Sequence, residues 1–214
     1  IIKVINESNK VITVSDKLKE IGENLVSDSN KITTIYNGFD FDKIYNSRTE
    51  LEKKYKDKFI LLSIGNLIKS KGHDLTIKAL SRLKNKYDNL HLIIIGDGNE
   101  KNDLKNLAKK LNVRSQIEFL GRINHKNVMK YISIADIFVL PSWKEGFGVV
   151  YLEAMAHEKA VIACKNEGID GIIKNNVNGM LVKRKSINDL EKKLDFLIKN
   201  NNIRKRISKK AKNT

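Results

Sequence analysis

The chain lacks the features that mark secreted scaffolds and membrane proteins. It has one cysteine, Cys164, among 214 residues, so no disulfide can form within it. Such sparse cysteine fits a reducing compartment, and we expect a cytoplasmic domain. No apolar run approaches the roughly 18 residues of a membrane-spanning helix, and no signal peptide is recognisable. The sequence therefore predicts a globular domain rather than a disulfide-stapled or membrane-spanning one.

Acidic and aromatic residues are also scarce. Against 41 lysines and arginines stand 25 aspartates and glutamates, which gives a formal net charge of +16. Such a charge is typical of proteins that bind nucleic acid, anionic membranes or phosphorylated substrates, although a composition rich in Lys, Asn and Ile accounts for part of it. Aromatic residues make up 7% of the chain. Because they form no stripe with basic residues, we expect no nucleic acid as a partner.

What the chain does have is a regular alternation of apolar runs and helical patterns. The strand-like runs span 59–65, 90–96, 116–121, 136–142, 159–164 and 179–182, and the helical patterns span 73–87, 100–113, 125–135, 149–157, 169–174 and 186–200. Nearly apolar strands separated by helices indicate a parallel sheet that is covered on both faces. We therefore predict an α/β fold with a doubly wound parallel sheet.

The two ends of the chain differ from this pattern. Residues 1–36 are expected to be the end of a preceding domain with its linker, in which a short strand precedes Ser15, a candidate helix cap. Residues 33–44 form a turn-rich connection. The main domain is assigned to 37–200, and 201–214 is expected to be a basic, solvated tail that is either a helix or a frayed end over 203–212. Because the chain begins Ile-Ile-Lys, we also expect it to be a fragment.

The stretch LPSWKEGFGVVYLEAMAHEKAVIA, residues 140–163, reads as a strand end, a glycine turn and a helix. The first N–H groups of a helix lack internal partners and its macrodipole is positive there, so this helix start can bind an anion. Gly146 and Gly148 would let the backbone close on a ligand. Glu145 and Glu153 could bind hydroxyl groups at the two ends of a ligand with an anion in between. A nucleotide-diphosphate sugar has that layout.

A diphosphate site needs a cation, and the stretch SIGNLIKSKGHD supplies Lys71, with Lys69 as a less certain second choice. Lys71 stands just before another predicted helix, so a phosphate could meet both its ammonium group and backbone N–H groups. Gly65 and Gly96 end two predicted strands, where doubly wound sheets bind their ligands. These glycines either let the backbone approach a ligand or simply make tight turns.

Several of these motifs together resemble a known family. The segment EGFGVVYLE, with seven residues between its glutamates, is followed by AMA and by KAVIAC, in which Ala160 stands where proline is usual. NGFD at 37–40, SIGNLIKSKG, and EGIDGIIKNNVNGMLV at 167–182 agree with it. Over about 35–200 the chain resembles the C-terminal, donor-binding domain of retaining glycosyltransferases with the two-domain GT-B fold. This is the large group 1 family of capsule, lipopolysaccharide and sucrose-type synthesis.

The resemblance implies a role for each matched residue. Glu145 and Lys71 would be catalytic, the first at the transferred sugar and the second on the diphosphate, and Glu153 would bind the ribose hydroxyls. Further donor contacts would come from Gly65, Asn66, Gly96, Arg122, Ile123, Gly146, Phe147 and Gly148, with the base near Arg122 and Ile123. Asn66 departs from the family, in which arginine is usual, so charge stabilisation would rest more on Lys71 unless Lys69 or Arg122 compensates.

The implied reaction transfers a sugar from a nucleotide-diphosphate sugar to a saccharide or lipid-linked acceptor with retention of anomeric configuration. It would need no metal and no other cofactor, and it would serve bacterial polysaccharide biosynthesis. The missing N-terminal domain of the same chain would bind the acceptor, so the fragment alone should bind donor but hardly turn it over. Surface lysines could hold the enzyme at the anionic inner face of the membrane.

Other interpretations stay open at this point. A nucleotide-sugar epimerase or a phosphorylase of the same fold would need further catalytic groups, and a non-enzymatic basic module would bind anionic membrane or nucleic acid in a salt-sensitive way. The four histidines show no metal spacing and are expected to have surface or packing roles: His73, His91, His125 and His157. Trp143 and Phe147 either wall the sugar pocket or pack in the core, and Cys164 is expected in the core.

Overall fold

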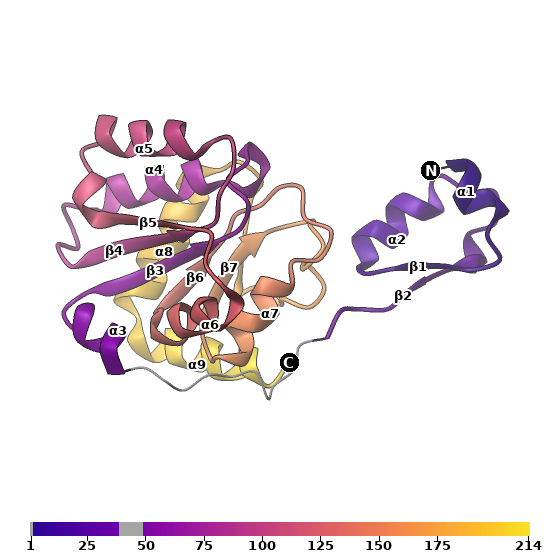
Figure 1. Ribbon diagram of the computed structural model, residues 1–214. Coiled ribbons are helices and arrows are strands. Elements are labelled where there is room, and N and C mark those ends of the chain that lie inside the picture. Colours follow the sequence, from indigo (N-terminus) through magenta and orange to yellow (C-terminus); the bar gives the residue numbers. More distant parts are fainter. Residues whose placement is uncertain (1, 39–48) are drawn as a thin grey trace.

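The main body of the protein is a six-stranded parallel sheet (Figure 1). The computed structural model describes residues 2–38 and 49–214. The strands of this sheet are β3 (Phe59–Ile64), β4 (Leu90–Ile95), β5 (Ile117–Gly121), β6 (Ile137–Val139), β7 (Ala160–Cys164) and β8 (Met180–Val182). Their order is β5-β4-β3-β6-β7-β8, with parallel pairing throughout. The predicted α/β fold is confirmed, and each strand lies within a predicted apolar run.

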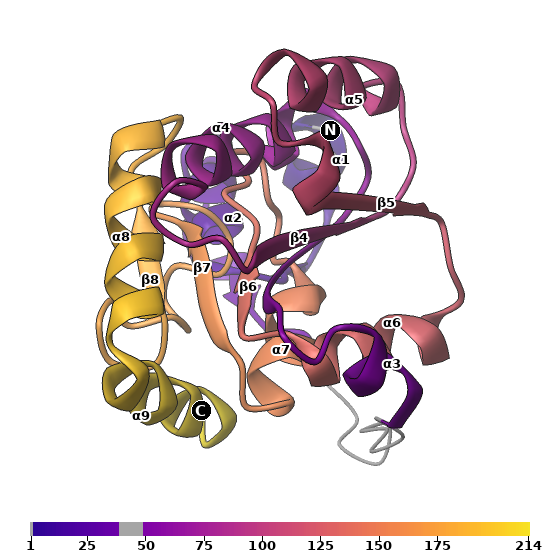
Figure 2. The ribbon, with the colours of Figure 1, turned by 90° about the vertical axis from the view of Figure 1, so that its left-hand side faces the viewer.

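Helices cover both faces of the sheet (Figure 2). One face packs against α4 (His73–Leu83), α5 (Lys101–Lys110) and α8 (Ile187–Lys199), and the other against α3 (Thr49–Lys54), α6 (His125–Ile134) and α7 (Val149–Ala156). Side chains alternate along each strand, so Leu61 enters the first core while Ile60 and Leu62 enter the second. Cys164 lies in the first core, as expected, and is 1% exposed.

Residues 2–38 form a smaller unit with its own two-stranded sheet. It contains α1 (Ile2–Glu7), β1 (Val11–Thr13), α2 (Asp16–Glu23), a 3₁₀ turn (Ser29–Lys31) and β2 (Ile32–Thr34), and β1 and β2 pair in parallel. The Ser15 hydroxyl accepts a hydrogen bond from the N–H of Leu18 at 3.3 Å, which confirms the predicted strand, cap and helix. The predicted connection over 33–44, with its Asn-Gly-x-Asp segment at 37–40, falls partly outside the described residues.

The short helix predicted over 169–174 is not formed. The segment is a turn with an isolated bridge between Asp170 and Ile173. Gly171 has a φ of +133°, a conformation outside the right-handed helical region, so the chain cannot continue as a helix through it. Ile169 and Ile173 are 0% and 1% exposed and anchor this turn in the second core.

The basic helix expected over 203–212 is formed, but the expectation that it is solvated on all sides is wrong. Residues 201–212 form α9 (Asn201–Lys212), which packs against α7, α8 and β7. Ile207 is 0% exposed and Ala211 is 2% exposed. With Ile203 these residues recur every fourth position, so one side of a strongly basic helix is apolar and buried. The packed unit therefore includes α9.

Candidate functional site

The order of the strands reverses between β3 and β6, and we call the region beyond the carboxyl ends of these two strands the crevice. After β3 the chain adds β4 and β5 on one side of it, then returns to place β6, β7 and β8 on the other. Doubly wound sheets bind ligands beyond the carboxyl ends of the strands at such a reversal. The loops after β3 and β6 are joined here, because the N–H of Trp143 donates to the carbonyl of Ser70 at 2.9 Å. Gly72, with a φ of +72°, is so close that a Cβ would lie 2.6 Å from the carbonyl oxygen of Pro141.

These joined loops bring the two predicted catalytic side chains together. Nζ of Lys71, in the 3₁₀ turn Lys69–Lys71, donates to Oε2 of Glu145 at 2.5 Å. The side chains are 17% and 12% exposed, so solvent screens the pair less than it screens a surface ion pair. An anionic ligand that reaches Lys71 must therefore share this cation with Glu145.

The second predicted glutamate has a partner that the sequence did not reveal. Oε1 of Glu153, on α7, lies 2.8 Å from Nε2 of His125, the first residue of α6. The Glu153 side chain is 12% exposed, and that of His125 is 53% exposed. His125 is thus a surface residue, as expected, but it also contacts the carboxylate assigned to the ligand. The only sequence signal for this contact was the position of His125, two residues beyond Ile123, which is itself a predicted donor contact.

Gly65, Gly96 and Gly121 meet where three neighbouring strands end. Gly96 has a φ of +140°, and a Cβ on it would lie 1.9 Å from the carbonyl oxygen of Gly65. The N–H of Gly96 donates to the carbonyl of Gly121 at 2.9 Å. Close backbone packing therefore suffices to explain glycine at Gly96, and contact with a ligand stays a prediction.

Asn66, Arg122 and Ile123 lie at the same edge of the sheet. Asn66 and Arg122 are exposed, and Ile123 is partly buried against the second core. Arg122 is near enough to Asp97 to help lower the pKa of that carboxyl, behind the larger effects of Lys101 and the Gly98 N–H. Asn66 and Arg122 are accessible to a ligand, and the roles of all three residues at the base and the diphosphate stay predictions.

The start of α7 is shaped by Gly148, its N-cap residue. Gly148 has a φ of +85°, and a Cβ there would come within 2.6 Å of the Tyr151 ring. Just before it, Phe147 is 3% exposed, and its ring centroid lies 6.0 Å from that of Tyr36. Phe147 therefore packs in the core, whereas Trp143, at 9% exposure, both packs and lines a cavity. The backbone contacts predicted for residues 146–148 stay predictions.

A loop after β7 braces this turn; its residues Glu167 and Gly168 open the motif at 167–182, but that motif did not predict the contact. The N–H of Glu145 donates to Oε2 of Glu167 at 3.1 Å, and the N–H of Gly168 donates to the carbonyl of Glu145 at 3.0 Å. A Cβ on Gly168 would lie 2.0 Å from the carbonyl oxygen of Gly146. Glu167 thus binds the N–H of Glu145, and Gly168 binds its carbonyl.

His73 supports the Lys71 loop from the interior. It is 1% exposed, and its Nδ1 lies 3.0 Å from Oγ of Ser63. Burial lowers the pKa of His73 to about 4, against the opposing effect of the Asn66 backbone. The imidazole is therefore neutral near pH 7 and adds no charge beside Lys71. The expected packing role is confirmed for this histidine.

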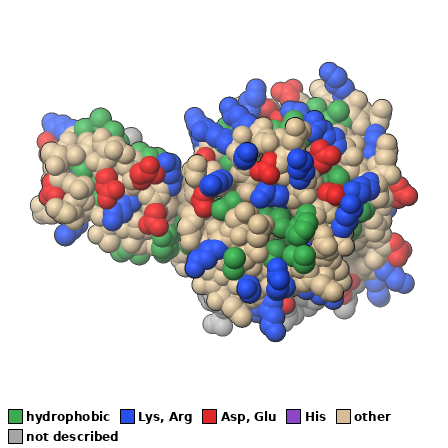
Figure 3. Space-filling model, turned by 180° about the vertical axis from the view of Figure 1, so that it is seen from behind, with side chains coloured by type: hydrophobic (Ala, Val, Ile, Leu, Met, Phe, Trp, Pro, Cys, Tyr) green, Lys and Arg blue, Asp and Glu red, His purple; other side chains and the backbone are tan. Residues whose placement is uncertain are grey.

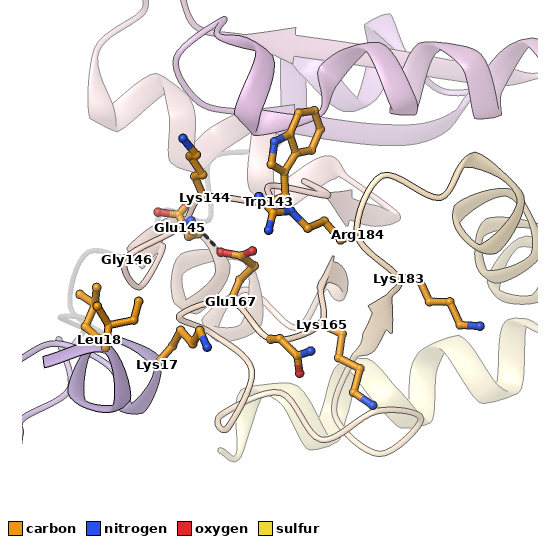
Figure 4. A pocket seen from close by; sticks show the side chains of 12 residues that line it. Lys17, Leu18, Trp143, Lys144, Glu145, Gly146, Lys165, Glu167, Lys183 and Arg184 are labelled. Carbon is orange, nitrogen blue, oxygen red and sulfur yellow. Dashed lines mark hydrogen bonds between the residues drawn. The ribbon is translucent and has the colours of Figure 1, made fainter. Parts of the chain in front are cut away.

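A cavity of about 720 Å³ opens on the other side of the Glu145 turn (Figure 4). We call it the basic cavity. It lies between α2 and the loops that follow β6, β7 and β8. Its lining comprises Lys17, Leu18, Ile21, Trp143, Lys144, Glu145, Gly146, Lys165, Asn166, Glu167, Lys183 and Arg184. Lys71, Glu153 and His125 do not line it, so it is distinct from the crevice between β3 and β6.

The arrangement thus brings together Lys71, Glu145 and the start of α7, and it places Glu153 further along the same helix. Within residues 2–38 and 49–214, no group of three or more His, Cys, Asp or Glu side chains could hold a metal ion. Among the described helices, none has the length and apolarity needed to cross a membrane.

Comparisons with known proteins agree with this architecture. The family model for glycosyl transferases group 1 matches residues 47–214. The chain is 33% identical over 196 residues to the N-acetylgalactosamine-N,N'-diacetylbacillosaminyl-diphospho-undecaprenol 4-alpha-N-acetylgalactosaminyltransferase of Campylobacter jejuni, covering 91% of this chain and 52% of that protein. The chain spans about half the length of the curated relatives it matches.

Two solved structures extend the comparison. The C-terminal domain of LpcC, a glycosyl transferase group 1 family protein of Francisella tularensis, superimposes with a TM-score of 0.75 at 31% identity, covering 82% of this chain and 95% of that one. Anabaena HepE in complex with UDP and glucose gives a TM-score of 0.91 at 22% identity, covering 99% of this chain and 59% of that one, a likeness of fold alone. The chain therefore belongs to the glycosyl transferases group 1 family, and its six-stranded unit has the fold of a GT-B C-terminal domain.

Proposed function

We propose that the chain supplies the donor site of a retaining glycosyltransferase, which moves a sugar from a nucleotide-diphosphate sugar to a saccharide or lipid-linked acceptor. The observation that carries the proposal is the meeting of Lys71, Glu145 and the start of α7 at the crevice between β3 and β6. A shielded cation and a helix N-terminus together suit a diphosphate. Glu153 lies further along the same helix, where a ribose attached to that diphosphate would reach it.

Each residue then has a defined task. Lys71 and the N–H groups at the start of α7 stabilise the negative charge that develops on the departing diphosphate. Glu145 contacts the transferred sugar, and Glu153 accepts hydrogen bonds from the ribose hydroxyls. The further donor contacts are the backbone of Gly65, Gly96, Gly146, Phe147 and Gly148, the side chain of Asn66, and Arg122 with Ile123 at the base. Because Lys71 supplies the positive charge, no metal ion is required.

The transfer itself depends on more than this chain. The acceptor hydroxyl attacks the anomeric carbon from the face that the diphosphate leaves, so configuration is retained. Groups that position the acceptor belong to an N-terminal domain, and effective catalysis requires both partners in register. The chain alone therefore binds donor with little turnover. An epimerase or phosphorylase would use the same crevice, but among the described residues no additional catalytic constellation favours either of them.

The relatives support this choice of ligands. The solved structure of HepE is a complex with UDP and glucose, and the relative from Campylobacter jejuni is named for a diphospho-undecaprenol acceptor. By the same reasoning, we place the enzyme in bacterial polysaccharide biosynthesis, in the cytoplasm.

Association with the anionic inner face of the membrane is part of the proposal. Lys and Arg surround a central group of hydrophobic side chains on the face formed by α8 and α9 (Figure 3). Lys192, Lys193 and Arg206 line a cavity there together with Phe196, which is 42% exposed. Flotation of the chain with phosphatidylglycerol vesicles, but not with phosphatidylcholine vesicles, is the expected result. Equal flotation or none with both would contradict this part.

The experiment that tests the donor site is a titration of the chain with UDP, GDP and ADP and with their sugars, by thermal shift and calorimetry. We expect one base to bind, and EDTA to leave its affinity unchanged because no metal is needed. Lys71→Met should lower the affinity for that nucleotide far more than Lys69→Met, which removes a neighbouring exposed lysine. A folded chain that binds none of the nucleotides, or that binds them only with a divalent metal, would contradict the proposal.

A further inference from the structure

The basic cavity carries charge that its own carboxylates do not neutralise. Five cations line it, Lys17, Lys144, Lys165, Lys183 and Arg184, against two carboxylates, Glu145 and Glu167. Glu145 already pairs with Lys71, and Glu167 accepts the N–H of Glu145. Of the five cations, only Lys17 has an ion-pair partner among the described residues, Glu20 at 2.9 Å. The cavity therefore presents a net positive field to a ligand.

Cations without an ion-pair partner among the described residues also occur elsewhere, as at Lys105, Lys109 and Lys110 on α5. Other cations have one: Lys78 and Arg82 on α4 pair with Asp74 at 2.7 Å and Glu191 at 3.0 Å, and Lys86, just after α4, pairs with Asp195 at 2.5 Å. What distinguishes the basic cavity is that four cations without such partners line one hollow, which favours a role in binding an anion.

The parallel register places these cations side by side. Cys164 of β7 pairs with Val182 of β8, so Lys165 and Lys183 follow adjacent strand ends. The N–H of Lys165 donates to the carbonyl of Val182 at 2.8 Å, which fixes this alignment. Two cations at adjacent strand ends both add to the positive field that an approaching anion meets.

The side chains divide into an inner and an outer set. Arg184 reaches toward Trp143 and Glu145, whereas Lys165 and Lys183 extend outward at the mouth (Figure 4). Across the cavity, Lys17 projects from α2 toward Glu167. An inner guanidinium can bind two phosphate oxygens at once, and lysines at the mouth raise the local concentration of anions.

We propose that the basic cavity binds a phosphate-bearing group of the acceptor. The proposal rests on the proposed function, because it uses the assignment of Glu145 to the transferred sugar. The backbone of Glu145 and Gly146 separates the basic cavity from the crevice that holds Lys71. A molecule in the cavity therefore adjoins the sugar that leaves the donor, while the donor diphosphate occupies the other side. The phosphate belongs either to a lipid-linked diphosphate or to a soluble sugar phosphate.

The test is calorimetric titration of the chain with farnesyl diphosphate and with glucose 1-phosphate, at about 150 mM salt to screen general charge effects. The variant K165Q/K183Q/R184Q removes three cations from the cavity. Its matched control is K105Q/K109Q/K110Q, which removes the same charge from α5. We expect the cavity variant to lower the affinity for the probe at least tenfold, about 1.4 kcal/mol. We expect the control to change that affinity less than about twofold.

A second titration, with the nucleotide that binds best, separates this proposal from the donor site. We expect the probe to bind equally well when nucleotide saturates the crevice, and both triple variants to keep nucleotide affinity. If only farnesyl diphosphate binds, the acceptor is lipid-linked. If only glucose 1-phosphate binds, the acceptor is a soluble sugar phosphate. The proposal is overturned if neither probe binds, if nucleotide displaces the probe, or if both variants weaken it equally. Failure of nucleotide binding itself contradicts the donor site instead.

Discussion

The two ends of the candidate donor site differ in how their carboxylates are held. At the diphosphate end, Glu145 pairs with Lys71 at 2.5 Å, and both side chains are less than one fifth exposed. At the proposed ribose end, Glu153 is equally shielded, but its partner His125 is 53% exposed and lies on a different helix. A permanent cation on joined loops is preorganised, whereas an exposed imidazole can move away. The difference indicates that the first end is built for fixed charge and the second for a partner that is exchanged.

The largest expected effect is on the pH dependence of stability. It arises at the diphosphate end, where the buried, neutral His73 supports the Lys71 loop. The pKa of His73 falls to about 4 in the fold, below the value of about 6.5 in an unfolded chain. Between these values the unfolded state binds more protons, so stability should fall as the pH drops from 6.5 to 4 and stay level above 6.5 as far as this group is concerned. The shift corresponds to about 3 kcal/mol.

Urea unfolding at several pH values checks this expectation. His73→Gln cannot titrate, so the free energy of unfolding should fall less steeply for the variant than for the wild type over the same range. The difference isolates His73 from the carboxyl groups that titrate nearby. Parallel pH profiles for the two proteins would show that the interior of the diphosphate end tolerates a charged imidazole.

Lys71→Met should weaken the binding of a ligand that has a diphosphate and leave the binding of a ligand without one unchanged, which distinguishes the two ends of the site. Removing a charge-assisted bond costs about 2 kcal/mol, or roughly thirtyfold in affinity, for a nucleoside diphosphate. The corresponding nucleoside has no phosphate and should bind the variant as it binds the wild type. Calorimetry with both ligands measures the contrast. If nucleoside and nucleotide weakened together, Lys71 would be acting on the whole site and the division into two ends would fail.

Glu153→Gln should weaken nucleoside and nucleotide to the same extent, by about tenfold, because a neutral amide accepts ribose hydroxyls less strongly than a carboxylate. His125→Gln should have a smaller effect, since a hydrogen bond to an exposed partner contributes about 1 kcal/mol. The same calorimetric titrations apply. If the His125 variant lost as much affinity as the Glu153 variant, the imidazole would be a fixed part of the site.

Glu145→Gln should have the smallest effect, and in the opposite direction. Glu145 competes with a diphosphate for Lys71, so its neutralisation should tighten nucleoside diphosphate binding by about threefold. The melting temperature should fall, because Lys71 loses its partner in the free protein. Titration of the variant beside the wild type checks the sign. Weaker binding would mean that Glu145 helps to hold Lys71 in place for the ligand.

The sequence predicts the sheet of this protein better than its turns. Apolar strands such as Leu90–Ile95 are recognisable because burial on both faces leaves no place for polar residues. The helix predicted over 169–174 failed because a single glycine, Gly171, has a backbone conformation that composition does not reveal. The burial of α9 was hidden by its lysines, although Ile207 and Ala211 recur at helical spacing.

The candidate site shows the same division. Lys71 and Glu145 were both marked by glycine turns at strand ends, and the strand order brings them together. His125 and Glu167 were missed because each acts on a residue at least 22 positions away, and a contact of that kind has no local pattern. The side-chain hydrogen bonds that complete the site follow from tertiary packing rather than from sequence periodicity.

The close approach of Gly168 to Gly146 has a further consequence. With only 2.0 Å between the place of a missing Cβ and the Gly146 carbonyl oxygen, no other amino acid fits at Gly168 unless the two loops separate. The Glu145 turn therefore rests directly on the backbone of the loop after β7, and Glu167 holds it there. A side chain larger than hydrogen at position 168 would push the loop after β7 away from the Glu145 turn and weaken the two hydrogen bonds that hold the Glu145 backbone.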